Sequence, residues 1–277
     1  MLTSIINRVI YQPGMTVADV QFTPAALSFR FEDIQLIAAD GVKITGWYIL
    51  APNPRGAVLY LHGNAGNRRD WAQVAPEFID RGYNLFILDY RGYGESEGKP
   101  SEKGLYLDGE AAWNWLTARA QLDRIPAYVL GKSLGSGVAS YLAARQAPAG
   151  LILDSAFTAM HDLIAIHARW LPRVLTPKLY DTLSRIETIT CPTLVIHGER
   201  DDLVPLLHGL TLYRSLRAPK ALAIIPGAGH NDIDAFDEYH RWVFSFLSRP
   251  LHFVQTAQDI SESALPSHWQ TRKHGSV

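Results

Sequence analysis

Three side chains of this 277-residue sequence could together carry out nucleophilic catalysis: Ser133, Asp201 and His230. Ser133 stands in the string GKSLG at 131–135, a Gly-X-Ser-X-Gly pattern. A serine hydroxyl is a weak nucleophile near neutral pH, so it needs a general base, and the base needs a carboxylate that fixes its tautomer and stabilises its charged form. We predict His230 as the base and Asp201 as the carboxylate.

The segment around Ser133, PAYVLGKSLGSGVASYLA at 126–143, predicts a buried strand, a sharp turn and a helix in direct succession. Glycines two residues before and after the serine would let strand and helix approach closely, and the serine itself would occupy a strained turn. The start of the helix adds positive potential where an oxyanion would form. By itself the string also fits a glycine-rich turn with a capping serine, so the interpretation depends on the other residues.

Both partners of Ser133 follow apolar runs of strand length. Asp201 comes just after TLVIHG, and His230 comes just after ALAIIPG. The order serine, aspartate, histidine is the one expected when these residues lie at the carboxyl ends of strands in an open sheet. Asp202 and Asp154 are the alternatives for the acid, and an ordinary loop histidine is the alternative for His230.

Backbone amides are the expected stabilisers of an oxyanion. One should be the N–H of Leu134, directly after the nucleophile, and the other should come from HGNAGN at 62–67, which follows the apolar run AVLYL. Asn64 is the preferred second donor and Ala65 the alternative. We interpret His62 as a structural loop residue, because His230 already fills the role of base.

The elements that must position these residues alternate between strand and helix. Runs such as NLFILDY and GLILDSA are too apolar to alternate between core and solvent, which is typical of strands covered on both faces. Segments of helical period separate them, as in 71–79. The pattern predicts an α/β fold with a doubly wound, mostly parallel sheet. The runs IQLIAAD and KITGWYILA could form an antiparallel hairpin at its edge.

Composition narrows the class of protein. With 47% hydrophobic and 19% charged residues, the chain is expected to fold around a large core. Its 26 basic and 27 acidic residues give a net charge of −1, which favours no attraction to nucleic acid or anionic membrane. The single Cys191 excludes an intrachain disulfide. The first 15 residues match neither a signal peptide nor a membrane span, so we expect a cytoplasmic protein without an integral membrane segment.

We predict three regions along the chain: an N-terminal extension at 1–28, one catalytic domain at 29–249 and a polar C-terminal tail at 250–277. A short insert at about 157–190 interrupts the domain. Fewer than about 40 residues can form at most a small cap, so the site should be rather open. Phe157, Met160 and Trp170 in this insert could line an acyl pocket or could simply pack a helix on the sheet. The oligomeric state stays open.

Six motifs together resemble the α/β-hydrolase superfamily over roughly residues 30–248: LYLHGNAGN, DYRGYGESEG, LGKSLGSG, LILDSAF, CPTLVIHGERDDLVP and PGAGHND. Within this superfamily they resemble the bud-emergence-protein-like branch, which is similar to eukaryotic depalmitoylating thioesterases. The resemblance implies an eight-stranded α/β-hydrolase fold with a small cap or none, the same triad, an oxyanion loop at 62–67 and a structural or rim role for Arg91. Lys132 stands where the branch more often has arginine. The sequence shows neither the membrane anchor nor the cysteine-rich N-terminus of some relatives, which argues against membrane-bound depalmitoylation.

The expected activity is hydrolysis of carboxylic esters or thioesters with small to medium acyl chains through an acyl-enzyme intermediate, without metal or organic cofactor. Such an enzyme would be a carboxylesterase or a thioesterase-like hydrolase. A peptidase or amidase with the same triad is one alternative. A catalytically silent binding protein of the same fold is another, because fold alone does not fix function.

Overall fold

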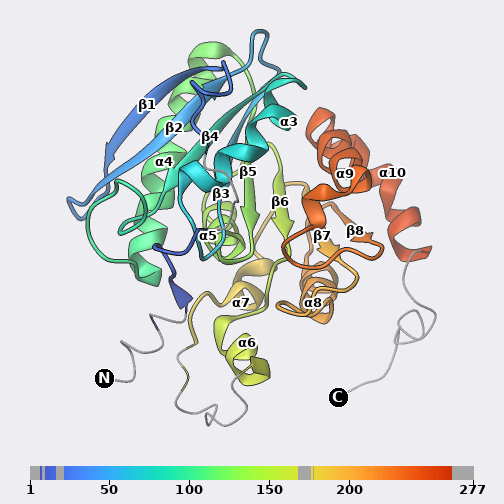
Figure 1. Cartoon of the computed structure of the whole chain (residues 1–277). Helices are drawn as coiled ribbons and strands as arrows, with labels where there is room; N and C mark the ends of the chain where they lie inside the picture. Colours follow the sequence, from blue (N-terminus) through green and yellow to red (C-terminus); the bar gives the residue numbers. More distant parts are fainter. Residues whose placement is uncertain (1–6, 8–9, 17–21, 168–175, 177, 264–277) are drawn as a thin grey trace.

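The computed structural model describes residues 7, 10–16, 22–167, 176 and 178–263 of the chain. Its centre is an eight-stranded sheet in the order β1-β2-β4-β3-β5-β6-β7-β8 (Figure 1). The strands are β1 (Arg30–Ile37), β2 (Lys43–Leu50), β3 (Gly56–Leu61), β4 (Tyr83–Asp89), β5 (Ala127–Lys132), β6 (Leu151–Asp154), β7 (Thr193–Gly198) and β8 (Lys220–Ile225).

Six of the eight strands, from β4 to β8 across the sheet, run parallel, whereas β2 is antiparallel to both β1 and β4. This arrangement confirms the predicted α/β fold and the predicted edge hairpin, formed by β1 and β2. Parallel neighbours need crossover connections, and helices supply them. The carboxyl ends of the parallel strands therefore meet at one edge of the sheet, where the candidate site residues follow β3, β5, β7 and β8.

Helices cover both faces of the sheet (Figure 1). The helices are α2 (Arg68–Trp71), α3 (Ala75–Ile79), α4 (Glu102–Asp123), α5 (Leu134–Ala143), α6 (Met160–His167), α7 (Thr182–Ile186), α8 (Leu207–Ser215), α9 (Asp237–Ser248) and α10 (Pro250–Ser263). Apolar residues of α4, α5 and α8 share one core cluster with the sheet, and those of α3, α9 and α10 share the other. Every residue of β3 and β4 is buried, which explains why their sequences show no alternation.

The C-terminal region differs from the predicted polar tail. Residues 250–263 form α10, and its Val254 and Ala257 are buried in the core beneath it. The ring of Phe253 packs edge-on against Trp242 and Phe246 of α9. Phe253, Val254 and Ala257 thus pack the first two turns of this helix onto the domain. Residues 264–277 lie outside the described part of the chain.

The N-terminal region is not simply an extension either. Ile10 and Tyr11 are buried and belong to the core cluster on the α5 side of the sheet. Figure 1 shows this dark blue segment at the same end of the molecule as α6 and α7. The predicted insert contains these two short helices, and α6 projects from the body of the molecule.

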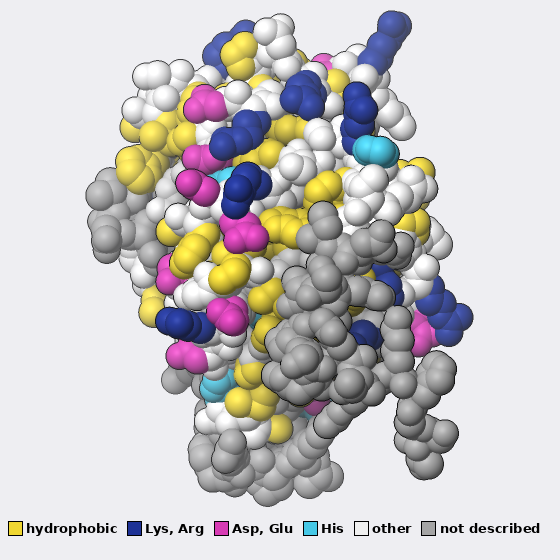
Figure 2. Space-filling view, turned by 90° about the vertical axis from the view of Figure 1, so that its right-hand side faces the viewer, with side chains coloured by type: hydrophobic (Ala, Val, Ile, Leu, Met, Phe, Trp, Pro, Cys, Tyr) yellow, Lys and Arg dark blue, Asp and Glu magenta, His cyan; other side chains and the backbone are white. Residues whose placement is uncertain are grey.

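No helix among the described residues is both long and apolar enough to cross a membrane. On the face shown in Figure 2, basic and acidic side chains lie interspersed with apolar ones. This distribution agrees with the nearly balanced charge of the sequence.

Candidate active site

Ser133 lies on the turn between β5 and α5, in a backbone conformation that only few residues other than glycine adopt. Its φ is 50° and its ψ is −116°. Such a conformation costs energy and persists only where the surroundings enforce it. Here the Ser133 amide donates a hydrogen bond of 2.9 Å to the carbonyl of Asp154, at the end of β6. The neighbouring strand thus helps to hold the serine on its strained turn.

The two glycines of the turn are required by close backbone approach. A Cβ at Gly135 would collide with the carbonyl oxygen of Leu61, and a Cβ at Gly131 would collide with the carbonyl of Gly135. Residues with a side chain at either position would push β5, α5 and the end of β3 apart. The structure therefore gives both glycines the steric role that the sequence pattern indicated.

The structure brings Ser133, His230 and Asp201 together, although they are far apart in the sequence. The Nε2 atom of His230 lies 3.0 Å from Oγ of Ser133, and its Nδ1 atom lies 2.7 Å from Oδ2 of Asp201. With a proton on Nδ1, His230 donates to Asp201 and offers the Nε2 lone pair to the serine hydroxyl. This is the geometry that a nucleophile, a general base and an orienting carboxylate need.

Asp201 is held by the turn that follows it. Its Oδ1 accepts hydrogen bonds from the amides of Leu203 and Val204, at 3.1 and 2.7 Å. Burial opposes ionisation of this carboxyl, but the hydrogen bonds from His230 and Val204 outweigh burial and hold its pKa below the usual range. Asp201 is therefore an anion at neutral pH, as stabilisation of a charged His230 requires.

A second buried histidine supports the same turn. The Nε2 atom of His197 lies 2.7 Å from the carbonyl oxygen of Val204 and 3.4 Å from Oδ2 of Asp201. Burial lowers the pKa of His197, so the ring is neutral and its proton sits on the nitrogen that faces the carbonyl. The sequence motif TLVIHGERDDLVP contained this residue, but its spacing gave no indication of the contact.

The two alternative acids have other surroundings. Asp202 is exposed. Asp154 is fully buried at the end of β6, where its Oδ2 accepts a hydrogen bond of 2.9 Å from the hydroxyl of Tyr239 and lies 3.5 Å from Nζ of Lys132. Lys132, directly before the nucleophile, is also buried. Neither alternative carboxylate is in contact with His230 among the interactions of the described residues.

The loop at 62–67 lies against the nucleophile. A Cβ built on Gly63 would be 3.8 Å from the Cβ of Ser133. Four carbonyls along this loop accept hydrogen bonds. From outside the loop, the Tyr90 hydroxyl donates to His62, the Tyr93 hydroxyl and the Gln12 amide to Asn64, and the Trp71 indole to Ala65. Within the loop, the His62 ring donates to the carbonyl of Gly63. In the part of the chain that the structure describes, the amides of Asn64 and Ala65 donate to none of the protein's acceptors.

His62 is fully buried among aromatic rings of Trp71, Tyr90 and Tyr93. Burial lowers its pKa to about 4, so the ring is neutral at neutral pH. Its Nδ1 donates to the carbonyl of Gly63 at 2.8 Å. These contacts agree with the interpretation of His62 as a structural residue of the loop.

Two other motif residues hold loops near the site. Arg91 is buried and pairs with both Asp108 and Asp40, which fastens the loop after β4 to α4 and to the β1–β2 turn. Asp89 accepts a hydrogen bond of 2.6 Å from the amide of Arg68 at the start of α2. Arg91 therefore has the structural role that the resemblance implied.

Two of the predicted substrate-binding residues, Phe157 and Met160, are buried in the core cluster beneath the insert. The ring of Phe157 packs edge-on against Tyr180. Trp170 lies outside the described residues. The packing interpretation therefore accounts for Phe157 and Met160 in this structure, and their contact with an acyl chain stays a prediction.

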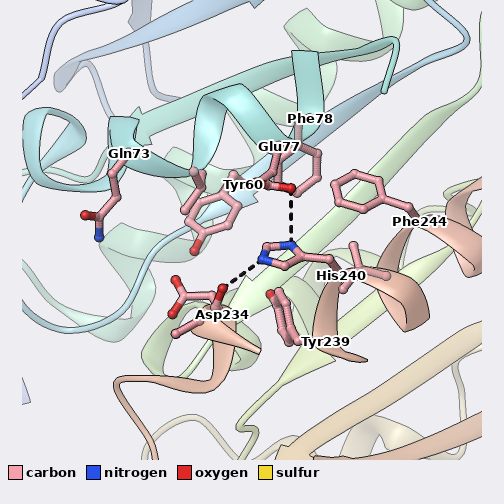
Figure 3. Close-up of a pocket in the computed structure, with 11 residues that line it drawn as sticks. Tyr60, Gln73, Glu77, Phe78, Asp234, Tyr239, His240 and Phe244 are labelled. Atoms are coloured by element: carbon pink, nitrogen blue, oxygen red, sulfur yellow. Dashed lines mark hydrogen bonds and ion pairs between the residues drawn. The ribbon is translucent and has the colours of Figure 1, made fainter. Parts of the chain in front are cut away.

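Figure 3 shows a separate pocket of about 310 Å³ between α3 and α9. Glu77, Asp234 and His240 line it, and its wall includes Tyr239, the residue that donates to Asp154. No triad residue lines this pocket, so it is not part of the candidate active site. The described residues contain no group of three or more His, Cys, Asp or Glu side chains placed to hold a metal ion.

Comparisons with known proteins agree with this fold. A family model described as the alpha/beta hydrolase fold matches residues 56–176. Alpha/beta hydrolase domain-containing protein 17B of Homo sapiens is 34% identical over 205 residues, which span 73% of this chain and 69% of the relative. An uncharacterised protein of Mycobacterium tuberculosis is 39% identical over 238 residues, 83% of this chain and 82% of the relative.

Among solved structures, an esterase of Pyrococcus furiosus superposes with a TM-score of 0.72 and 26% identity, covering 87% of this chain and 99% of the esterase. The chain belongs to the α/β hydrolase fold family, and fold and relatives together make it a hydrolase.

Proposed function

We propose that the protein is a serine hydrolase that cleaves carboxylic esters or thioesters with small to medium acyl chains. The observation that carries this proposal is the continuous contact from Ser133 through His230 to Asp201, at 3.0 and 2.7 Å. The esterase among its structural neighbours supports the choice of ester chemistry.

In the proposed mechanism, Oγ of Ser133 attacks the acyl carbonyl carbon while Nε2 of His230 accepts the hydroxyl proton. The ionised Asp201 stabilises the resulting imidazolium. The imidazolium then gives its proton to the departing alcohol or thiol, which leaves an acyl group on Ser133. Water attacks this acyl-enzyme with His230 again as base, and the free acid is released.

The oxyanion of each tetrahedral intermediate is proposed to accept hydrogen bonds from the amides of Leu134 and Asn64. Leu134 is the first residue of α5, so its amide belongs to the free donors at a helix start. Asn64 lies on the loop whose carbonyls are turned toward other partners. Donors fixed in this way need no reorganisation when charge develops.

The proposed substrate range rests on the size of the insert, of which α6 and α7 are described. A cap of this size leaves room for small and medium acyl groups and offers little surface to enclose a long one. No metal or organic cofactor takes part in the proposed mechanism, and the cytoplasmic location stays a prediction.

Hydrolysis of p-nitrophenyl acetate, butyrate, octanoate and palmitate by the wild type and by Ser133→Ala tests the proposal. We expect turnover that is highest for the shorter esters and absent in the variant. Preference for aminoacyl anilides over esters would instead favour the peptidase or amidase alternative. No turnover of any ester, thioester or anilide by folded protein would favour the silent binding protein.

A further inference from the structure

The N-terminal segment at 10–12 lies directly against the loop that is proposed to hold the oxyanion. The amide of Gln12 donates a hydrogen bond of 2.9 Å to the carbonyl of Asn64, and Gln12 forms a parallel β-bridge with Ala65. This contact joins residues more than 50 positions apart. The position of the segment in the sequence gave no indication of it.

The segment is fixed in this place by two buried side chains. Ile10 and Tyr11 are each 4% exposed. The hydroxyl of Tyr11 lies 2.8 Å from that of Tyr180, which packs over Gly137, one turn along α5 from the nucleophile. The segment therefore spans from the insert to the oxyanion loop and passes beside the start of α5.

The hydrogen bond from Gln12 controls the orientation of one peptide plane. In a trans peptide the carbonyl and the following N–H point in opposite directions. The His62 ring holds the peptide before Asn64 by a hydrogen bond to the Gly63 carbonyl. The peptide after Asn64 is held at its carbonyl by the amide of Gln12 and by the hydroxyl of Tyr93, the latter at 2.8 Å. Asn64 thus lies between two fixed planes, and the Gln12 amide supplies one of the two donors that fix the second.

We propose that Gln12 is a positioning residue of the hydrolase: its backbone N–H fixes the peptide plane that follows Asn64, and this limits rotation about the Asn64 backbone and keeps the Asn64 N–H, in the peptide before it, facing the reacting carbonyl. This inference rests on the proposed function, because it assigns the segment a part in stabilising the oxyanion. It makes the N-terminal segment part of the active site rather than an extension of the domain.

A matched pair of variants isolates the N–H group. Gln12→Pro and Gln12→Ala both lose the side chain, and only the proline variant loses the backbone donor. Loss of a whole oxyanion donor costs about 10²- to 10³-fold in kcat. We expect the smaller effect of a misplaced donor, roughly a tenfold lower kcat for Gln12→Pro than for Gln12→Ala with KM within a factor of two.

A second readout is the rate constant for labelling of Ser133 by a fluorophosphonate. Ser133 attacks phosphorus and fluoride leaves, and the phosphonyl oxygen, which gains negative charge in this step, also needs the oxyanion donors. This labelling rate constant should fall together with kcat in Gln12→Pro. Val254→Ala, a core variant in α10 remote from the loop, controls for lowered stability: it should reduce the melting temperature and leave both rate constants within a factor of two.

If Gln12→Pro does not fold, the comparison moves to Tyr11→Ala and Tyr11→Phe. The alanine variant removes the buried anchor of the segment, and the phenylalanine variant keeps the ring. A roughly tenfold lower kcat for alanine than for phenylalanine would support the inference. Equal kcat and labelling constants within each pair would overturn it. Absence of Ser133 labelling in the wild type would refute the serine-hydrolase proposal itself, and the inference with it.

Discussion

Nδ1 of His230 lies 2.7 Å from Oδ2 of Asp201, and the adjacent Asp202 is exposed. The pair of neighbouring aspartates provides a matched test of which carboxylate acts. Asp201→Asn should lower kcat by roughly 10³- to 10⁴-fold, because the amide no longer fixes the His230 tautomer or balances its charge. Steady-state kinetics on p-nitrophenyl butyrate measure this effect.

Asp202→Asn is the control for that experiment, since it changes the same charge one residue away. It should retain kcat within a factor of about two, as expected of an exposed carboxylate outside the hydrogen-bonded chain. A larger loss of kcat for Asp202→Asn than for Asp201→Asn would show that Asp202, and not Asp201, is the acid.

The buried Lys132 beside the nucleophile gives a prediction about stability. Lys132→Met removes the cation, and among the described residues this leaves buried Asp154 with only the Tyr239 hydroxyl as a polar side-chain partner. We expect a loss of about 3–5 kcal/mol in the free energy of unfolding, since an unpaired buried charge is costly.

Urea unfolding of the wild type, Lys132→Met and Lys132→Met/Asp154→Asn measures the effect of Lys132. The double variant should recover part of the stability, because no charge is left unpaired. A loss below about 1 kcal/mol in the single variant, typical of an exposed ion pair, would show that the buried pair does not stabilise this turn.

The lowered pKa of His62 predicts how the stability of the protein depends on pH. Burial lowers its folded-state pKa from 6.5 to about 4, so between these values the unfolded chain binds a proton that the folded chain does not. The contribution of neutral His62 to the free energy of unfolding is therefore complete above pH 6.5. It falls by about 3 kcal/mol in all as the pH decreases toward 4. Burial lowers the pKa of His197 and His208 as well, so they act in the same direction.

His62→Asn separates the contribution of His62 from the other two histidines, because the asparagine amide can still donate to Gly63 and does not titrate. Urea unfolding at pH 7, 5.5 and 4.5 should show a smaller loss of stability on acidification in the variant than in the wild type. The same pH dependence in both proteins would mean that His62 is protonated in the folded state.

The sequence predicted the sheet, its edge hairpin and the strand-turn-helix around Ser133, because long apolar runs and paired glycines act locally. Contacts that depend on distant packing were missed. The hydroxyl of Tyr93 and the amide of Gln12 meet at Asn64 only in the folded chain. The residue type at position 12 gives no indication that the backbone N–H of Gln12 makes this contact.

The helix α10 was missed for a different reason. Within 250–257, where burial is described, Val254 and Ala257 lie in the core with polar residues between them. The apolar residues of α10 recur at a helical spacing, but the polar composition after Pro250 favoured a surface extension. The ends of the domain were therefore predicted less well than its centre.

The central claim is that Ser133 is a nucleophile activated by His230. Incubation with a fluorophosphonate, followed by intact-mass and peptide mass spectrometry, tests it without knowledge of the substrate. We predict one adduct on Ser133 in the wild type, none in Ser133→Ala and much slower labelling in His230→Ala. Folded wild-type protein that stays unlabelled, or an adduct on another residue, would contradict the account.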